Sequence, residues 1–181
     1  MKRFAGMTAL LILFSGSLGA TNVIVELKAQ YFSPTDQVFR DIYGGGMMYG
    51  GEVSVGVWKG LEAWFGGSYF SSEGELTFTK EITELEIVPI EVGLRYRWAG
   101  ESFSFYAGGG LSFTSFKESN PIGDISEGGT GFMAEIGSYV RITGGLLIDL
   151  YVNYSGCRIE SPDFDIEIGG FAAGVGLAYE F

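Results

Sequence analysis

The sequence contains no histidine, a single cysteine (Cys157) and only four prolines among 181 residues. Without histidine, no Ser-His or His-Asp site can form. One cysteine excludes an intramolecular disulfide. Beyond residue 20, no apolar run approaches the roughly 20 residues that a transmembrane helix requires. These absences argue against histidine-dependent enzymes, disulfide scaffolds and helical membrane proteins.

Positive charge is also scarce, with 11 lysines and arginines against 22 aspartates and glutamates. Such an acidic chain is a poor partner for the phosphates of nucleic acid. Glycine, in contrast, is abundant, with 30 residues where an average composition of about 7% would give far fewer. Aromatic residues make up 15% of the chain. Composition therefore favours a glycine-rich and aromatic-rich β protein that does not bind nucleic acid.

The first twenty residues have the pattern of a secretory signal peptide. Lys2 and Arg3 provide the positive start, Thr8–Phe14 the apolar core and Ser15–Ala20 the small-residue exit. The apolar core is too short to span a bilayer as a helix. We therefore expect residues 1–20 to be removed after export, which leaves residues 21–181 as one domain.

Apolar and small or polar residues alternate over most of that domain, which is the period of a β-strand with two different faces. The clearest case is the end of the chain, where Phe171, Ala173, Val175, Leu177, Tyr179 and Phe181 share one face. Eight such stretches are predicted to be strands. They span residues 22–32, 47–58, 61–78, 85–98, 103–116, 131–142, 146–156 and 171–181.

The connections between these stretches alternate in length. Residues 59–60, 99–102 and 143–144 are short turns, whereas residues 33–46, 79–84, 117–130 and 157–165 are mostly longer and polar. Short turns on one rim and long loops on the other are typical of outer-membrane barrels, with turns periplasmic and loops outside. A sheet in lipid must also close, because open edges leave backbone groups unpaired. The sequence therefore predicts an all-β, eight-stranded antiparallel up-and-down transmembrane barrel with both termini periplasmic.

The polar face of the predicted strands carries seven acids and four bases. Inside an eight-stranded barrel, which is just wide enough for side chains to fill, such charges must be paired or hydrated. We expect a structural ion-pair network that closes the lumen, and a narrow or gated pore is the alternative. The residues are Glu26, Lys28, Glu52, Glu62, Glu91, Arg95, Arg97, Glu135, Arg141, Asp149 and Glu180.

Aromatic residues of the apolar face gather near the strand ends, as in the girdles of membrane barrels. The residues we assign to these girdles are Tyr31, Trp98, Phe103, Phe113, Tyr154, Phe171, Tyr179 and Phe181. Trp58 and Trp64 instead have the polar parity, so each either marks a lapse of the alternation near a turn or plugs the barrel floor. Pro89 lies inside a strand and predicts a bulge.

The segment from Asp36 to Tyr43 has the pattern of one short amphipathic helical turn, with Val38, Phe39, Ile42 and Tyr43 on its apolar side. We expect it to cap the barrel mouth or to touch the outer leaflet. Paired carboxylates that could support catalysis, Glu84 with Glu86 and Asp163, Asp165 with Glu167, are expected to be solvated surface groups. The acidic loops could also attract divalent cations, a possibility that the sequence leaves open.

With its signal segment, eight strands, unequal rims and aromatic ending, residues 21–181 resemble the small OmpA-type outer-membrane β-barrel (porin-like) superfamily. The ending Tyr179-Glu180-Phe181 is similar to the signal read by the barrel-assembly machinery. The resemblance implies an outer-membrane protein whose partners are outer-membrane lipids and that machinery. No nucleic acid, cofactor or metal is expected, and the barrel is expected to be a monomer.

The function expected from these features is a structural or surface-interaction role, without catalysis and with at most weak pore activity. One alternative is a narrow channel for small or apolar solutes. A second alternative is a secreted soluble barrel that carries a lipid, which would place the bulky apolar residues inward and the charged residues outward.

Overall fold

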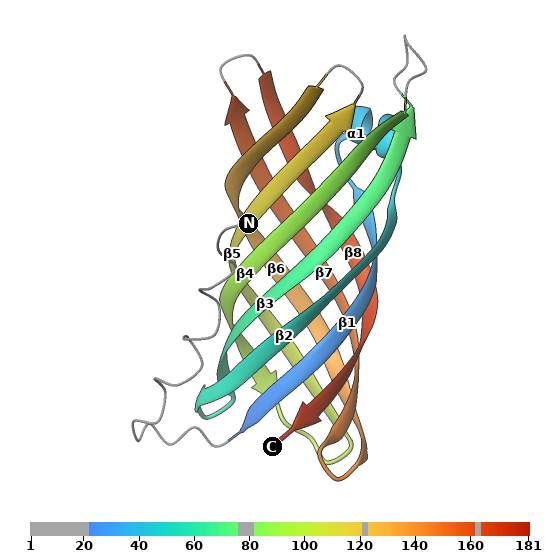
Figure 1. Ribbon diagram of the computed structural model, residues 1–181. Coiled ribbons are helices and arrows are strands. Elements are labelled where there is room, and N and C mark those ends of the chain that lie inside the picture. Colours follow the sequence, from blue (N-terminus) through green and yellow to red (C-terminus); the bar gives the residue numbers. More distant parts are fainter. Residues whose placement is uncertain (1–21, 76–81, 121–122, 162–163) are drawn as a thin grey trace, which may run out of the picture.

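The computed structural model describes residues 22–75, 82–120, 123–161 and 164–181, with one closed barrel of eight antiparallel strands (Figure 1). The predicted signal peptide, residues 76–78 of the third predicted strand and Asp163 lie outside the described residues. The strands are β1 (Val23–Pro34), β2 (Gly46–Trp58), β3 (Leu61–Glu75), β4 (Ile82–Trp98), β5 (Phe103–Asn120), β6 (Gly123–Thr143), β7 (Leu146–Ser161) and β8 (Phe164–Glu180).

Each strand pairs with its neighbours in the chain, and β8 returns to pair with β1, for example at Leu27 and Leu177. The up-and-down antiparallel barrel predicted from the alternation is therefore confirmed. Closure leaves the membrane-facing wall without an open edge, which lipid could not satisfy.

The two ends of the barrel differ. At one end, which we call the turn end, β1 begins, β8 ends and tight turns join β2 to β3 and β6 to β7. Lys59 and Gly60 make the first of these turns with φ of 35° and 90°, a conformation that favours glycine. The opposite end, the loop end, carries the helix α1 (Gln37–Tyr43) and the tips of the longer hairpins (Figure 1).

Apolar side chains cover the outside of the barrel in a continuous belt. On β1 the belt runs from Val23 to Tyr31, and on β8 from Phe171 to Phe181. Both lengths match the roughly 9–11 residues with which a tilted strand crosses a bilayer. Glycines and charged residues on the same strands face the axis, where Arg95 is 1% and Asp149 0% exposed. The barrel therefore has the inside-out arrangement of a membrane protein.

Towards the loop end the two faces exchange their character. On β4, the inward side chains within the belt are polar or small and the outward ones apolar. Above the belt, Leu85 and Ile87 are inward and Glu84 and Glu86 outward, although the first two residues of the strand keep a polar inward side chain (Thr83) and an apolar outward one (Ile82). The neighbouring strands follow, with Phe70 and Phe116 inward and Ser71 and Lys117 outward. This upper part has the apolar interior and polar exterior of a barrel in water.

Two of the loops expected from sequence are mostly strand. The β5–β6 hairpin stays paired to Asn120 and Gly123, and the β7–β8 hairpin to Ser161 and Phe164. Polarity led to the wrong expectation, because segments 117–130 and 157–165 leave the apolar belt without leaving the sheet. Their outward faces become polar while backbone pairing continues.

The bulge predicted at Pro89 is wrong. β3 and β4 pair at Gly67 and Ile90 and again at Phe70 and Ile87 in the same register, with pairing interrupted only between them. On the other side, Pro89 pairs with Thr114 without a shift. Because Pro89 has no backbone N–H, β3 and β4 lose their pairing locally. The long ladders on either side keep the two strands in the same register. The described ladders shift register instead at Gly56/Trp58 and at Arg141/Thr143, both beside turns.

The two tryptophans of unexpected parity have different positions. Trp58 follows the register shift at the turn end and is 68% exposed, so here the alternation lapses. Trp64 keeps the inward parity and is only 2% exposed inside the barrel. The lapse of the alternation therefore explains Trp58, whereas Trp64 is an inward side chain that lies further from the turn end than the ion pairs of Arg97.

Helix α1 forms where the short amphipathic turn was predicted. Asp36 caps it by accepting a hydrogen bond from the Phe39 amide at 2.7 Å. Phe39 points into the barrel and is buried, whereas Val38 is exposed, so the predicted apolar side was wrong for Val38.

Candidate functional site

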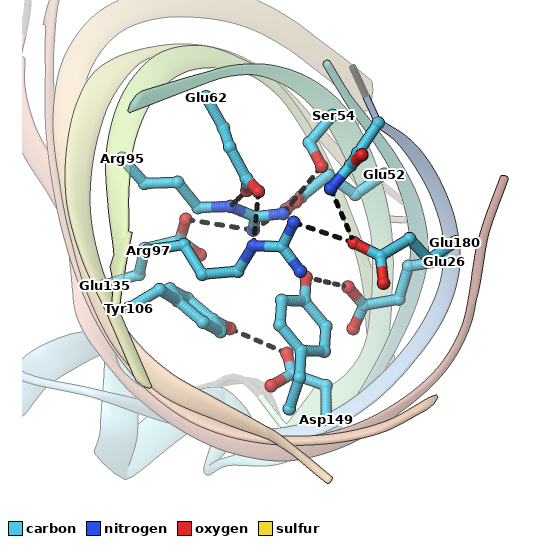
Figure 2. A network of polar contacts seen from close by, with 12 residues as sticks. Glu26, Glu52, Ser54, Glu62, Arg95, Arg97, Tyr106, Glu135, Asp149 and Glu180 are labelled. Atoms are coloured by element: carbon cyan, nitrogen blue, oxygen red, sulfur yellow. Dashed lines mark hydrogen bonds and ion pairs between the residues drawn. The ribbon is translucent and has the colours of Figure 1, made fainter. Parts of the chain in front are cut away.

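Arg95 of β4 lies at the centre of a polar network that fills the lumen at the height of the belt (Figure 2). Its Nη1 lies 2.6 Å from Glu52 Oε1 and its Nε lies 2.8 Å from Glu62 Oε2. Nη2 donates to Ser54 Oγ at 2.8 Å, and Glu135 Oε1 is 3.6 Å from Nη1. Three strands besides β4 thus bring their inward carboxylates to one guanidinium, which has five donors for such a task.

Two tyrosine rings, whose centres lie 5.1 Å from each other, both contact this arginine. The guanidinium carbon lies 4.7 Å from the centre of the Tyr106 ring and 5.5 Å from that of Tyr139. Tyr106 donates to Asp149 Oδ2 at 2.7 Å, and Tyr139 donates to Glu26 Oε2 at 3.0 Å (Figure 2). The rings therefore connect Arg95 to two carboxylates that it does not touch.

Sequence reasoning missed these tyrosines, because attention to aromatics was directed to the apolar face. The available signal was parity: Tyr106 alternates with Ser104 and Gly108 on the small, polar face. Its partner across the strand pair is Gly137, where a Cβ would overlap the tyrosine ring. The glycine makes room for the ring inside the barrel.

Lys28 of β1 forms the second centre of positive charge. Its Nζ lies 2.5 Å from Glu52 Oε2 and 3.6 Å from Glu135 Oε2. The same ammonium group lies 4.6 Å from the centre of the Tyr151 ring. Glu52 and Glu135 are therefore shared between Lys28 and Arg95, which joins the two centres into one network.

The network continues to the turn end. Arg97 reaches Glu62 Oε1 at 2.6 Å and Glu180 Oε1 at 2.8 Å. Arg141 pairs with Glu180 Oε2 at 2.5 Å, and its side chain is 41% exposed at the rim. Charge thus extends from the middle of the lumen to the opening beside the termini.

The structure brings ten of the eleven sequence-predicted lumen charges into this network. Glu91 stands apart, because among the described residues it has no ion pair within 4 Å. It lines a cavity of about 30 Å³ together with Gln30 and Asn153, which hydrogen-bond to each other at 2.9 Å. Such a volume has room for about one water molecule.

Above this cavity the lumen is closed by an apolar cluster, which we call the plug. The sequence analysis did not anticipate it, although its members keep the inward parity where their outward neighbours turn polar. It consists of Phe32, Phe39, Met48, Phe70, Leu85, Ile87, Phe116, Cys157, Ile168 and Ala172.

Helix α1 covers the plug from the loop end. Phe39 inserts into the cluster, Tyr43 packs against it, and Ser72 donates to the Tyr43 carbonyl at 2.7 Å. Gly74 lets the helix approach β3, since a Cβ there would lie 2.8 Å from the Ile42 carbonyl oxygen. Burial raises the pKa of the Tyr43 hydroxyl to about 12. The cap is thus fixed by packing and by a hydrogen bond at its last residue.

The aromatic residues assigned to girdles lie on the outside at the two edges of the belt. Tyr154 packs between Phe132 and Phe171, with ring centres 6.0 Å and 4.9 Å away. Those nearest the loop end are Tyr31, Phe113, Tyr154 and Phe171, and those nearest the turn end are Trp98, Phe103, Tyr179 and Phe181.

No helix in the described part of the chain is long and apolar enough to cross a membrane. Among the described residues, no group of three or more histidine, cysteine or acidic side chains is placed to hold a metal ion. Glu84 and Glu86 are outward on β4 above the belt, and the side chains of Asp165 and Glu167 lie outside the described set.

The fold matches several solved outer-membrane barrels. Neisserial surface protein A is 14% identical, with a TM-score of 0.64 over 88% of this chain and 97% of that chain. The N-terminal β-barrel domain of Pseudomonas aeruginosa OprF is 16% identical, with a TM-score of 0.58 over the same shares. Escherichia coli outer membrane protein W is 13% identical, with a TM-score of 0.52 over 87% of this chain and 97% of that chain.

Identities this low show a shared fold alone, and no curated protein matches significantly. The model of the outer membrane protein beta-barrel domain family matches residues 8–181. This match agrees with the inside-out barrel, the belt and the closed wall described above, and it confirms the resemblance drawn from the sequence. The chain therefore belongs to the outer membrane protein beta-barrel domain family.

Proposed function

We propose that this protein is a closed-lumen barrel of the bacterial outer membrane with a structural or surface-interaction role. It has no catalytic role and at most weak pore activity. The observation that supports the proposal is that side chains fill the lumen at two levels. Ion pairs around Arg95 occupy the belt region, and the plug occupies the region above it.

The ion-pair network is a poor pathway for ions. Arg95 is 1% exposed and Glu135 2%, so neither lines an open channel. An ion that moved through this level would have to separate partners 2.6–2.8 Å apart in a region with little water. Breaking a buried pair in this way costs several kcal/mol.

We propose the orientation usual for such barrels, with the turn end in the periplasm and the loop end outside. Two features support it: the short turns and both strand termini share one end, and the strands extend beyond the belt at the other. The terminal Phe181 is 73% exposed at the turn end. There it would be available to the barrel-assembly machinery, and lipids of the outer membrane would contact the belt.

A narrow channel for apolar solutes is the second candidate, and the apolar nature of the plug favours it over a channel for ions. Such a solute would have to displace Phe39 and the side chains below it, and then pass Glu91 and the ion pairs. The secreted soluble carrier does not fit, because Arg95 and Asp149 face the axis and the belt faces outward.

Conductance of the refolded protein in planar bilayers tests the closed lumen. We expect no steady conductance steps from the wild-type barrel. Arg95→Ala should raise conductance or lower stability, whereas Arg40→Ala, which removes an exposed charge on α1, should do neither. Steady wild-type steps that Arg95→Ala leaves unchanged would overturn the proposal.

A further inference from the structure

Two buried carboxyl groups of the lumen network, those of Glu26 and Asp149, have no cation beside them. Among the described residues, no lysine or arginine nitrogen lies within 4 Å of either group. Glu26 is 2% exposed and Asp149 0%, so bulk water does not take the place of a partner. An ionised carboxylate that is buried without a partner is costly.

The cations near these two acids are occupied by other carboxylates. Lys28 pairs with Glu52 and Glu135. Arg95 pairs with the same two acids and with Glu62. The network therefore joins six acids to only four bases, and its unpaired negative charge falls on Glu26 and Asp149.

All eight strands bring charged or titratable groups towards this pair (Figure 2). They are Lys28 on β1, Glu52 on β2, Glu62 on β3, Arg95 and Arg97 on β4, Tyr106 on β5, Glu135 and Tyr139 on β6, Tyr151 on β7 and Glu180 on β8. The acids in this set pair with the bases in it, and two of the tyrosines donate hydrogen bonds to the pair.

These tyrosines fix one oxygen of each carboxyl group and leave the other oxygen unsatisfied. Tyr106 donates to Asp149 Oδ2 at 2.7 Å, and Tyr139 donates to Glu26 Oε2 at 3.0 Å. The second oxygens, Asp149 Oδ1 and Glu26 Oε1, are buried without a hydrogen-bond partner. Because an ionised carboxylate is an acceptor only, two such groups cannot satisfy each other.

A glycine brings the two carboxyl groups to the same place. Asp149 of β7 pairs directly with Gly176 of β8, and Glu26 lies on β1, the strand on the other side of β8. A Cβ at Gly176 would overlap the Glu26 carboxyl group and would lie 3.1 Å from the Asp149 Cβ. Both side chains therefore reach over β8 where that strand has no side chain of its own.

We propose that Glu26 and Asp149 share one proton, which holds the lumen network together at neutral pH. The proton is taken up from water as the barrel folds. It is bonded to one of the two unsatisfied oxygens and is donated to the other, so that both gain a partner and the excess negative charge falls by one. Two carboxyl groups that share one site do not both ionise readily. The proposal concerns the stability of the network and does not rest on the role proposed above for the barrel.

The shared proton makes the stability of the barrel depend on pH. In the unfolded chain both carboxyl groups are exposed and ionised at neutral pH. The folded barrel then binds one proton more than the unfolded chain, so its stability falls as the pH rises. One proton corresponds to about a tenfold rise in the unfolding equilibrium constant per pH unit. We expect this dependence from about pH 6 to about pH 8, above the ordinary titration of carboxyl groups and below that of lysine and tyrosine.

Denaturant unfolding of the refolded barrel in lipid vesicles, repeated over this pH range, tests the proposal. The variants are Asp149→Asn and Glu26→Gln, because an amide accepts from the tyrosine and donates an N–H to the opposite oxygen without an ionisable proton. Either variant should remove the tenfold change per pH unit. Glu73→Gln, which removes an exposed carboxyl group on β3, should keep it. Heat-dependent gel mobility shows whether each variant is folded.

Infrared spectroscopy detects the proton itself. At neutral pH, the spectrum of the wild type minus that of Asp149→Asn should contain the C=O band of a protonated carboxyl group. Glu91→Gln is the competing variant, because Glu91 is another inward carboxyl group without an ion pair among the described residues. It should leave this band and the pH dependence of the pair in place.

A wild-type barrel whose stability does not fall between about pH 6 and about pH 8 would overturn the proposal without any variant. An equal pH dependence in the wild type, Asp149→Asn and Glu26→Gln would also overturn it. So would a pH dependence that Glu91→Gln alone removes, since the proton would then belong to Glu91. Absence of the carboxyl band from the difference spectrum would show that water or a metal cation, and not a proton, lies between the two groups.

Discussion

Replacing Arg95 by methionine should destabilise the barrel more than any other single loss of charge in the lumen. Methionine keeps much of the volume but leaves Glu52 and Glu62 without the partner that lies 2.6 and 2.8 Å away. Removing one member of a buried ion pair costs about 3–5 kcal/mol. The lost contact with the Tyr106 ring adds about 0.5–2 kcal/mol. We therefore expect the free energy of unfolding to fall by at least about 3 kcal/mol.

The assay is denaturant unfolding of the barrel in lipid vesicles, with the folded fraction read from heat-dependent gel mobility. Arg141→Met is the matched control, because Arg141 also pairs with a carboxylate but its side chain is 41% exposed. Exposed pairs contribute about 0–1 kcal/mol, so this variant should stay close to the wild type.

A compensating variant tests the reason for the loss. Adding Glu52→Gln and Glu62→Gln to Arg95→Met removes the unpaired carboxylates and should recover part of the stability. The reasoning is refuted if Arg95→Met loses no more than Arg141→Met does. It is also refuted if the triple variant is less stable than the single one.

Three further predictions concern the belt, the tyrosines and the cap. Leu177→Arg, in the middle of the belt, should lower the free energy of unfolding in vesicles by about 2–4 kcal/mol. Ser71→Arg, above the belt, should lower it by only about 0–1 kcal/mol. Equal losses in the two variants would contradict the position assigned to the belt. Tyr106→Phe removes the donor to Asp149 and should cost about 1–3 kcal/mol in the same assay; a neutral effect would show that the network does not depend on it. Phe39→Ala should speed tryptic cleavage within α1 while the barrel stays folded, and an unchanged rate would contradict the role of Phe39 as the anchor of the cap.

The barrel could be predicted because one physical pattern determines most of it. A period of two with glycine and charge on one face is stable only if that face turns inward in lipid, so Glu52 and Arg95 could be assigned to the lumen from parity. Pairing between particular charges could not be predicted. It depends on the stagger of the strands around the barrel, which brings Arg95 to Glu52 from a strand that does not neighbour its own.

The plug escaped prediction for a different reason. Parity alone places Leu85 and Ile87 inside, but these residues were interpreted as the start of a strand whose apolar face meets lipid. The reversal becomes visible only when Glu84 and Glu86 are recognised as the outward set. Polar sequence near Lys117 likewise suggested a loop, although in water a strand with a polar outer face is equally stable.

The positions of the tryptophans and of Tyr106 could be assigned only from the three-dimensional structure. Trp58 and Trp64 have the same parity in sequence, yet the register shift after Gly56 turns one outward and leaves the other inside. Tyr106 needed the space above Gly137, which only the β5–β6 register supplies.

The central claim is that the outward face of β4 is apolar within the belt and polar above it. The accessibility of spin labels along this strand measures that change most directly. Labels are placed singly at residues 84, 86, 90, 92 and 94 in a Cys157→Ala background, and collisions with oxygen and with a water-soluble nickel chelate are compared in lipid vesicles. The account predicts that Ile90, Val92 and Leu94 positions favour oxygen and that Glu84 and Glu86 positions favour nickel. Nickel access at residues 90–94 equal to that at residues 84 and 86 would contradict it.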